Sequence, residues 1–202
     1  MHHLANLALA FTLAAALAPA GEPTPGIKLF QENSFAEAER TLRAELEKDS
    51  GNAAVAAHHA LALLRLGKND EARAASARAV EAAPEEAITQ LAAAEIAAET
   101  GRPDDAIRAL EAATKADADH PRLPYAQGLV KVIRKDFPGA ARDLERACEL
   151  EPRNAYAHYY AGLAYNQVKR PDRMLSHFET FLRLAPSAPE AARVRSVMRT
   201  VK

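Results

Sequence analysis

The residues that could do chemistry are dispersed along this chain. His58 and His59 are adjacent, so on a helix their side chains point about 100° apart and cannot bind one ion as a pair. His120, His158 and His177 have no partner at ligand spacing, and the carboxylates are scattered. The chain has neither a glycine loop for phosphate nor a Gly-x-Ser-x-Gly turn. The pattern predicts no catalytic residue, no metal site and no cofactor, and we expect that the protein is not an enzyme.

Cys148 is the only cysteine, so an intramolecular disulfide is impossible. It follows Ala147 in a segment of helical periodicity. We interpret Cys148 as a small core residue rather than as a reactive thiol.

Charges nearly balance over the 202 residues, with 26 basic and 27 acidic side chains, so the composition does not favour a nucleic-acid partner. From Lys169 onward there are eight basic and three acidic residues, which makes the C-terminal end basic. Its last basic side chains form a solvated face, or else contact anionic lipid or an acidic protein patch. They are Arg193, Arg195, Arg199 and Lys202.

The elements that must position these residues recur every 34 residues. One series of small residues is Ala60, Ala94, Gly128 and Gly162. A second series is Ala72, Ala106, Ala140 and Met174. A third series is Ala79, Ala113, Ala147 and Phe181. A fixed period of this length is typical of a solenoid, in which each unit buries its apolar face against its neighbours.

Each unit is predicted to be a pair of helices. In the unit 53–86, Ala60 and Leu64 lie on one apolar face, the segment 67–70 breaks the helix, and a second helix ends before Pro84. Gly67 is suited to a left-handed cap, and Asn69 or Asp70 to capping the next helix.

The recurring residues resemble the tetratricopeptide repeat family. Its pattern of a small residue, an Ala, a second Ala and a closing Pro falls in the second unit on Ala60, Ala72, Ala79 and Pro84. The resemblance implies an all-α, right-handed solenoid of helix-turn-helix repeats. The repeats are expected at 53–86, 87–120, 121–154 and 155–188, after a degenerate repeat at 21–52 and before a capping helix at 189–202.

The resemblance also implies that a partner peptide or protein segment binds in the concave groove formed by the first helix of each pair. The carried-over groove residues are Leu61, Leu64, Arg65, Ile88, Leu91, Glu95, Arg122, Tyr125, Leu129, Val132, Tyr156, Tyr159, Leu163 and Asn166. This groove is mainly apolar, with tyrosines in its C-terminal half. Tyr125, Tyr156 and Tyr159 either anchor the partner or pack between repeats.

The first twenty residues differ from the rest. Leu4 to Ala18 carries no charge, and Ala18-Pro19-Ala20 offers small residues for cleavage. Residues 1–20 are therefore predicted to be a signal peptide cleaved after Ala20, which places the protein in the periplasm or outside the cell. An uncleaved anchor and a mis-assigned start are the alternatives.

The expected function is that of an exported scaffold or adaptor for protein–protein interaction, with a partner of unknown identity. The alternative is a membrane-tethered organiser that retains its N-terminal apolar segment. Membrane contact is expected only through residues 4–18 or the basic C-terminal helix, and no nucleic-acid partner is expected.

Overall fold

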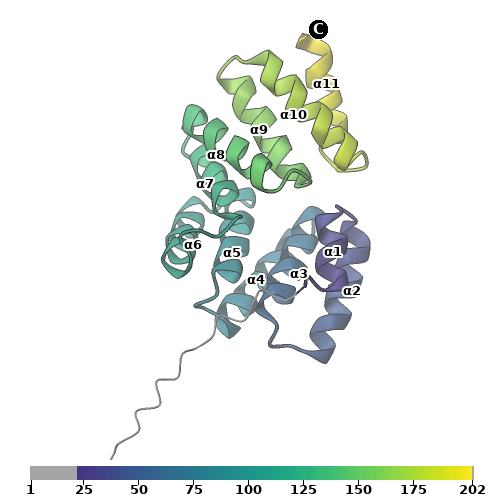
Figure 1. Ribbon diagram of the computed structural model, residues 1–202, viewed down its shortest axis with the longest axis vertical. Helices are drawn as coiled ribbons and strands as arrows, with labels where there is room; N and C mark the ends of the chain where they lie inside the picture. Colours follow the sequence, from purple (N-terminus) through teal and green to yellow (C-terminus); the bar gives the residue numbers. More distant parts are fainter. Residues whose placement is uncertain (1–21, 202) are drawn as a thin grey trace, which may run out of the picture.

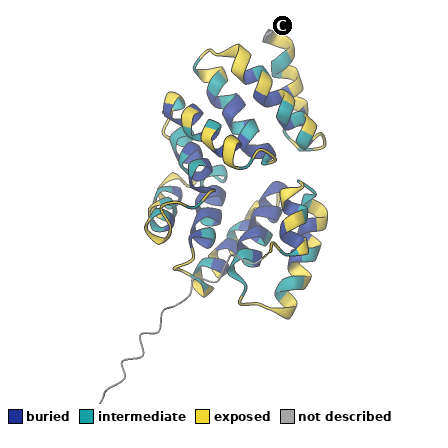
Figure 2. Cartoon of the chain, in the orientation of Figure 1, coloured by how far each residue is buried: buried dark blue, intermediate teal, exposed yellow. Residues whose placement is uncertain are grey.

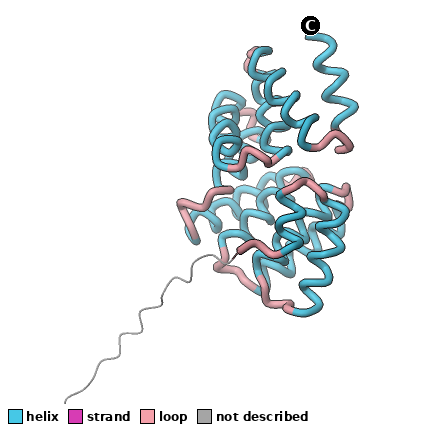
Figure 3. The backbone as a smooth tube through the Cα atoms, turned by 45° about the vertical axis from the view of Figure 1, so that its right-hand side comes forward, coloured by secondary structure: helices cyan, strands magenta, loops and turns pink. Residues whose placement is uncertain are grey.

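The computed structural model describes residues 22–201, and every regular element in that range is an α-helix (Figure 3). The eleven helices are α1 (Pro25–Gln31), α2 (Phe35–Lys48), α3 (Ala53–Arg65), α4 (Asn69–Ala82), α5 (Ala87–Glu99), α6 (Pro103–Ala116), α7 (Leu123–Ile133), α8 (Phe137–Leu150), α9 (Ala155–Gln167), α10 (Pro171–Leu184) and α11 (Ala191–Val201). The predicted signal peptide, residues 1–20, lies outside the described residues.

Consecutive helices pack as hairpins, and the hairpins follow a curved path (Figure 1). α1 and α2 at one end and α9 and α10 at the other lie on the same side of the curve, whereas α6 lies on the opposite side. The first helix of each hairpin contacts its own second helix and the first helix of the next hairpin. The predicted all-α solenoid of helix hairpins is therefore confirmed.

The turn inside every hairpin contains a left-handed residue at the same place in the repeat, with φ between 58° and 76°. These residues are Asn33, Gly67, Gly101, Lys135 and Lys169. The N–H of the following residue donates to a carbonyl near the end of the preceding helix, as Lys68 N does to Leu63 O at 3.0 Å. This is the Schellman arrangement, and it confirms the predicted left-handed cap at Gly67.

The residues that cap the helix N-termini differ in part from those predicted from the sequence. The predicted cap at Asn69 or Asp70 is wrong, because α4 begins at Asn69 and its N-cap is Lys68, whose side chain makes no capping hydrogen bond. Asn52 and Asn154 do cap α3 and α9, each accepting from a backbone N–H of the first turn at 3.1 Å.

The small residues of the first series allow the two helices of a hairpin to approach closely. A Cβ added to Gly128 would lie 2.5 Å from Leu144, and one added to Gly162 would lie 2.4 Å from the ring of Phe178. Such distances are well inside van der Waals contact, so the period in the sequence records a packing requirement between paired helices.

The C-terminal helix covers the end of the solenoid. Val194 of α11 is buried, and Val197 and Met198 pack partly buried against the core formed by α9 and α10. Arg193, Arg195 and Arg199 are exposed, so the polar side of α11 faces away from the core (Figure 2).

Among the described helices, none is both long and apolar enough to traverse a lipid bilayer.

Candidate functional site on the concave face

Arg65, at the end of α3, is held by carboxylates of the neighbouring repeat. Its guanidinium donates two 2.8 Å hydrogen bonds to the carboxylate of Glu99 and lies 3.6 Å from Glu95. The same guanidinium lies 3.9 Å from the centre of the Tyr156 ring, which is cation–π geometry. Arg65 therefore links α3, α5 and α9 through one buried side chain.

Arg122, immediately before α7, forms the second buried ion pair. It donates to Glu95 at 2.8 Å and 3.1 Å, and it lies 3.7 Å from Glu151. Although burial opposes its charge, Glu95 and Glu151 raise the pKa of Arg122 above its ordinary value. Burial raises the pKa of the Glu95 carboxyl, an effect that Arg122 and Arg65 oppose. The concave face thus contains paired charges with very little exposure to solvent.

Tyr125 contacts the Arg65–Glu99 ion pair through its hydroxyl. Its side chain is fully buried, and its hydroxyl is 3.4 Å from both Arg65 Nη2 and Glu99 Oε1. Burial raises the pKa of this phenol well above its usual range, so the hydroxyl stays protonated and can donate to Glu99.

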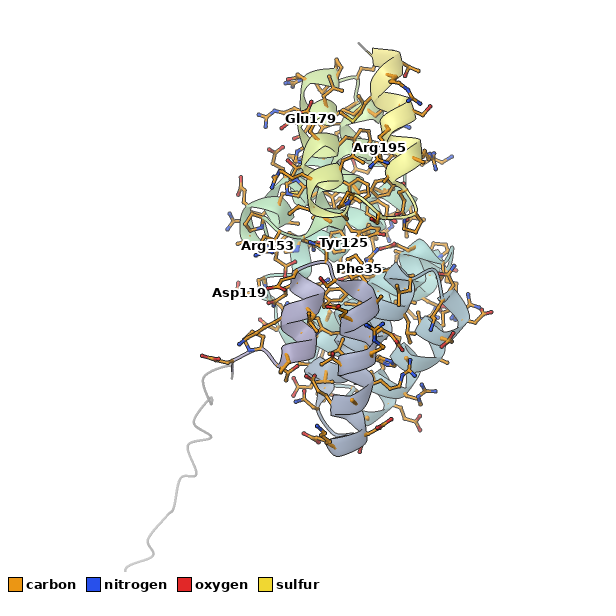
Figure 4. All side chains as sticks on the ribbon, turned by 90° about the vertical axis from the view of Figure 1, so that its right-hand side faces the viewer. Phe35, Asp119, Tyr125, Arg153, Glu179 and Arg195 are labelled. Carbon is orange, nitrogen blue, oxygen red and sulfur yellow. The ribbon has the colours of Figure 1, made fainter. Side chains whose placement is uncertain are left out.

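The first hairpin reaches across to the last one. Asn33 Nδ2 donates to the carbonyl of Arg153 at 3.0 Å, and the Phe35 ring meets Tyr156 edge-on with centroids 6.0 Å apart. Figure 4 labels Phe35, Tyr125 and Arg153 in the region where the first hairpin approaches the last one. The curve of the solenoid is therefore closed by side-chain contacts of the α1–α2 turn and the first residue of α2 with α9 and the turn that precedes it.

A pocket of about 340 Å³ remains beside this contact. Phe30, Phe35 and Tyr156 supply aromatic walls, and Arg65 and Arg122 also line the pocket. Amide and charged side chains of the turn before α9 complete it. The pocket combines apolar surface with hydrogen-bonding groups, which is typical of binding sites.

Most residues predicted to line an open groove are buried in the structure. They are Leu61, Leu64, Arg65, Leu91, Glu95, Arg122, Tyr125, Leu129, Tyr156 and Tyr159. Ile88, Val132 and Leu163 are half-buried, and Asn166 is exposed. The middle of the predicted groove is therefore not open, because ion pairs and adjacent helices fill it, and the binding of a partner by these residues stays a prediction. Of the predicted set, the pocket is lined by Arg65, Arg122 and Tyr156.

The sequence left two roles open for the tyrosines, anchoring a partner or packing between repeats, and the structure separates them. Tyr159 packs between helices, with its ring 5.2 Å from Phe181 and 5.0 Å from Tyr160. Tyr156 also packs on Phe181 at 5.9 Å, and its hydroxyl donates to Glu190 at 3.0 Å, but it contributes to the pocket as well. Tyr156 is consequently the tyrosine best placed to meet a partner.

The expectation that His158 and His177 lack partners at ligand spacing is wrong. Their Nδ1 atoms lie 3.1 Å apart, and Cys148 Sγ lies 4.0 Å from His177 Nδ1. Burial lowers the pKa of both imidazoles, and it raises the pKa of the Cys148 thiol to about 12. Cys148 is buried, as predicted, but it is part of a polar cluster.

Comparison with known proteins agrees with the repeat architecture of the chain. The family model described as tetratricopeptide repeat matches residues 26–87, 58–121, 91–130 and 125–189, which together cover most of the chain. The chain belongs to the tetratricopeptide repeat family. Tetratricopeptide repeat proteins act as scaffolds for protein–protein interaction, and the predicted family membership is confirmed.

The chain is similar in sequence to one known protein and in fold to solved structures. Cell division cycle protein 27 homolog A of Arabidopsis thaliana is 31% identical over 100 residues, which are 50% of this chain and only 14% of that protein. A chain of the APC/C hetero-tetramer Cut9-Hcn1 matches with TM-score 0.65 and 20% identity, over 87% of this chain and 35% of that one.

TTC0263, a tetratricopeptide repeat protein of Thermus thermophilus, matches with TM-score 0.63 and 18% identity, over 87% of this chain and 94% of that one. At these identities the two structures show that the fold is shared.

Proposed function

We propose that this chain is an exported adaptor that holds a short, extended segment of a partner protein in the pocket between α1 and α9. The observation that carries the proposal is the convergence of Arg65, Arg122 and Tyr156 on one pocket beside the contact between the first and last hairpins. All three side chains belong to the groove that the resemblance to the tetratricopeptide repeat family implies.

The size of the pocket supports an extended segment. The pocket holds about 340 Å³, so only a few residues of a partner can enter it. An α-helix with its side chains is about 10–12 Å wide. An extended chain is narrower, about 5 Å across in the direction of its backbone hydrogen bonds, and is therefore the better fit between the two hairpins.

The charges of the pocket favour contact through apolar and aromatic groups. Arg65 and Arg122 are already paired with Glu99 and Glu95, so neither needs an acidic residue of the partner. The aromatic walls offer contact area at low conformational cost. Binding should accordingly depend only weakly on salt.

Crosslinking tests the proposal. A photoreactive amino acid replaces Gln31, an exposed residue at the pocket, and in a matched control it replaces Glu179, an exposed residue on α10 (Figure 4). We expect a discrete protein adduct from position 31 that is absent from position 179 and weakened by Phe35→Ala. Equal labelling from both positions, or an adduct unaffected by Phe35→Ala, contradicts the proposal.

Export is a separate part of the proposal and rests on residues 1–20. Mass spectrometry of the protein from its native compartment measures the mature N-terminus. A chain that begins near Gly21 supports the exported adaptor, and a chain that retains residues 4–18 supports the membrane-tethered organiser.

A further inference from the structure

Three helices bring a thiol and two imidazoles together at the last hairpin. Cys148 lies near the end of α8, His158 in α9 and His177 in α10. One potential ligand atom from each residue can be chosen so that all three lie within 4.8 Å of one another. We propose that these three residues form a binding site for a divalent transition-metal ion of the zinc type.

The distances are close to those that such an ion requires. With bonds of about 2.05 Å to nitrogen and 2.3 Å to sulfur, a tetrahedral ion separates two nitrogen ligands by roughly 3.3 Å and a nitrogen from a sulfur by roughly 3.6 Å. The observed separations are 3.1 Å between the two Nδ1 atoms and 4.0 Å between His177 Nδ1 and Cys148 Sγ. Shifts of a few tenths of an ångström at the side chains bring these two pairs to the required separations, and the ligand atoms of the third pair, His158 and Cys148, lie within 4.8 Å of each other.

The remaining ring nitrogens have partners suited to orienting ligands. His158 Nε2 lies 3.1 Å from the carbonyl of Pro152, so this nitrogen carries the proton and Nδ1 presents its lone pair to the cluster. His177 Nε2 lies 3.9 Å from the Glu145 carboxylate, and its ring stacks on Tyr165 with centroids 5.5 Å apart. Backbone carbonyls and carboxylates in this position are the usual outer partners of metal-binding histidines.

The cluster is particular to one place in the solenoid. Moving each residue back by one repeat of 34 residues gives Thr114, Pro124 and Asp143, and moving back by two gives Val80, Gln90 and Ala109. The third step gives Leu46, Ala56 and Ala75. The earlier repeats fold with other side chains at these positions, so packing of the repeat does not by itself require the Cys–His–His set.

The donor set indicates the class of ion. One thiolate and two imidazoles suit zinc and related borderline-soft ions, and disfavour calcium and magnesium, which take oxygen ligands. Three protein ligands leave a fourth position for water or for a side chain of a partner.

Titration of the full chain with Co²⁺ tests the proposal, with His2→Gln and His3→Gln present throughout and no added histidine tag. Cys148 is the only cysteine, so a thiolate-to-cobalt charge-transfer band reports this residue alone. We expect the band to saturate at one equivalent of Co²⁺, with d–d absorption of tetrahedral intensity, and to vanish when Zn²⁺ is added, because zinc binds such sites more tightly. Absence of the band from the folded protein overturns the proposal, and this readout needs no variant at the site.

Variants then assign the ligands. Cys148→Ser should abolish the charge-transfer band, and His158→Gln or His177→Gln should weaken Co²⁺ binding at least tenfold. His120→Gln is the matched control, since His120 is half-buried and lies outside the cluster, and it should bind like the parent chain. Circular dichroism verifies folding of each variant. Unchanged affinity in both cluster-histidine variants, with folding intact, contradicts the assignment even if the thiolate band is present.

Discussion

Replacing Arg122 by Leu should destabilise the protein by about 3 kcal/mol. The substitution removes the partner of Glu95, whose side chain is fully buried and accepts bonds of 2.8 Å and 3.1 Å from Arg122. Removing one member of a buried ion pair costs about 3–5 kcal/mol, since the other charge is left without compensation. Arg65 lies 3.6 Å from Glu95 and retains part of the compensation, which places the expected loss at the lower end of this range.

A double-mutant cycle measures the part of that loss that belongs to the pair. Glu95→Leu should cost a similar amount, because it strips Arg122 of its bidentate acceptor and leaves only Glu151 at 3.7 Å. The double variant Glu95→Leu/Arg122→Leu carries neither charge and keeps the Arg65–Glu99 pair at 2.8 Å. Its loss should fall short of the sum of the single losses by about 2 kcal/mol or more.

Urea denaturation followed by far-ultraviolet circular dichroism provides the four free energies of unfolding. A loss of about 3 kcal/mol corresponds to a fall in Tm of roughly 6–12 °C for a chain of this size. Arg142→Leu is the control, because Arg142 is exposed on α8. Strict additivity of the two single variants, or single losses below about 1 kcal/mol, would refute the conclusion that the concave face is held by a buried ionic network.

Three further outcomes follow from individual sites. Gly162→Ala should cost about 1–3 kcal/mol in urea denaturation, because its Cβ would lie 2.4 Å from Phe178. Gly51→Ala, whose Cβ would meet only Asp49 at 3.5 Å, should be nearly neutral, and equal effects of the two would contradict the packing argument. Lys135→Gly should stabilise the protein by about 0.5–1 kcal/mol, since Lys135 has φ 59° and Gly adopts that conformation without the steric cost. Gly101→Ala, at φ 76°, should have the opposite effect in the same assay, and a gain there would exclude strain as the cause. Burial lowers the pKa of His58 to about 4, whereas in the unfolded chain it stays near 6.5. Between about pH 6.5 and pH 4 the imidazole of His58 binds a proton in the unfolded chain but stays largely neutral in the native protein. The free energy of unfolding should therefore fall by about 3 kcal/mol by pH 4. His58→Gln should show a smaller drop, and an identical pH profile would exclude His58 as a source.

The sequence was sufficient to predict the fold because the repeat is enforced by local packing. Gly128 and Gly162 are small since Leu144 and Phe178 face them, and Gly26 faces Leu42 in the first hairpin in the same way. The left-handed turn residues were only partly predictable. At Gly67 and Gly101 the glycine itself predicts the left-handed conformation. Lys135 and Lys169 give no such indication and adopt the conformation because the Schellman turn requires it.

The candidate site was harder to predict because it depends on how tightly the solenoid curves. The family pattern indicates which face of each first helix points inward, and three residues that it assigns to the groove, Arg65, Arg122 and Tyr156, line one pocket in the structure. It does not indicate that Asn33 meets the carbonyl of Arg153, 120 positions later. That contact depends on the small rotations between successive hairpins added over the whole array, so it cannot be predicted from the spacing of residues within one repeat.

The cysteine–histidine cluster escapes a sequence-based prediction for a different reason. Ligand spacing within one helix brings together i and i+4 neighbours. Cys148, His158 and His177 come from three helices, so their separations of 10 and 19 positions carry no helical signal. The packing of α8 against α9, and of α9 against α10, could have been expected from the repeat, and that register would have brought the three residues together.

Closure of the solenoid also determines what the concave face can bind. The contacts that join the first and last hairpins include one neutral hydrogen bond, Asn33 to Arg153, and one aromatic pair, Phe35 with Tyr156. A hydrogen bond of this kind contributes about 0.5–1.5 kcal/mol, and an aromatic pair contributes about 0.5–1.5 kcal/mol. A partner too large for the pocket must part the two hairpins and forgo about 1–3 kcal/mol, which lowers its affinity by roughly 5- to 150-fold. An extended segment that enters the closed pocket avoids this cost. The same contacts that hide the predicted groove therefore favour slender partners over helical ones.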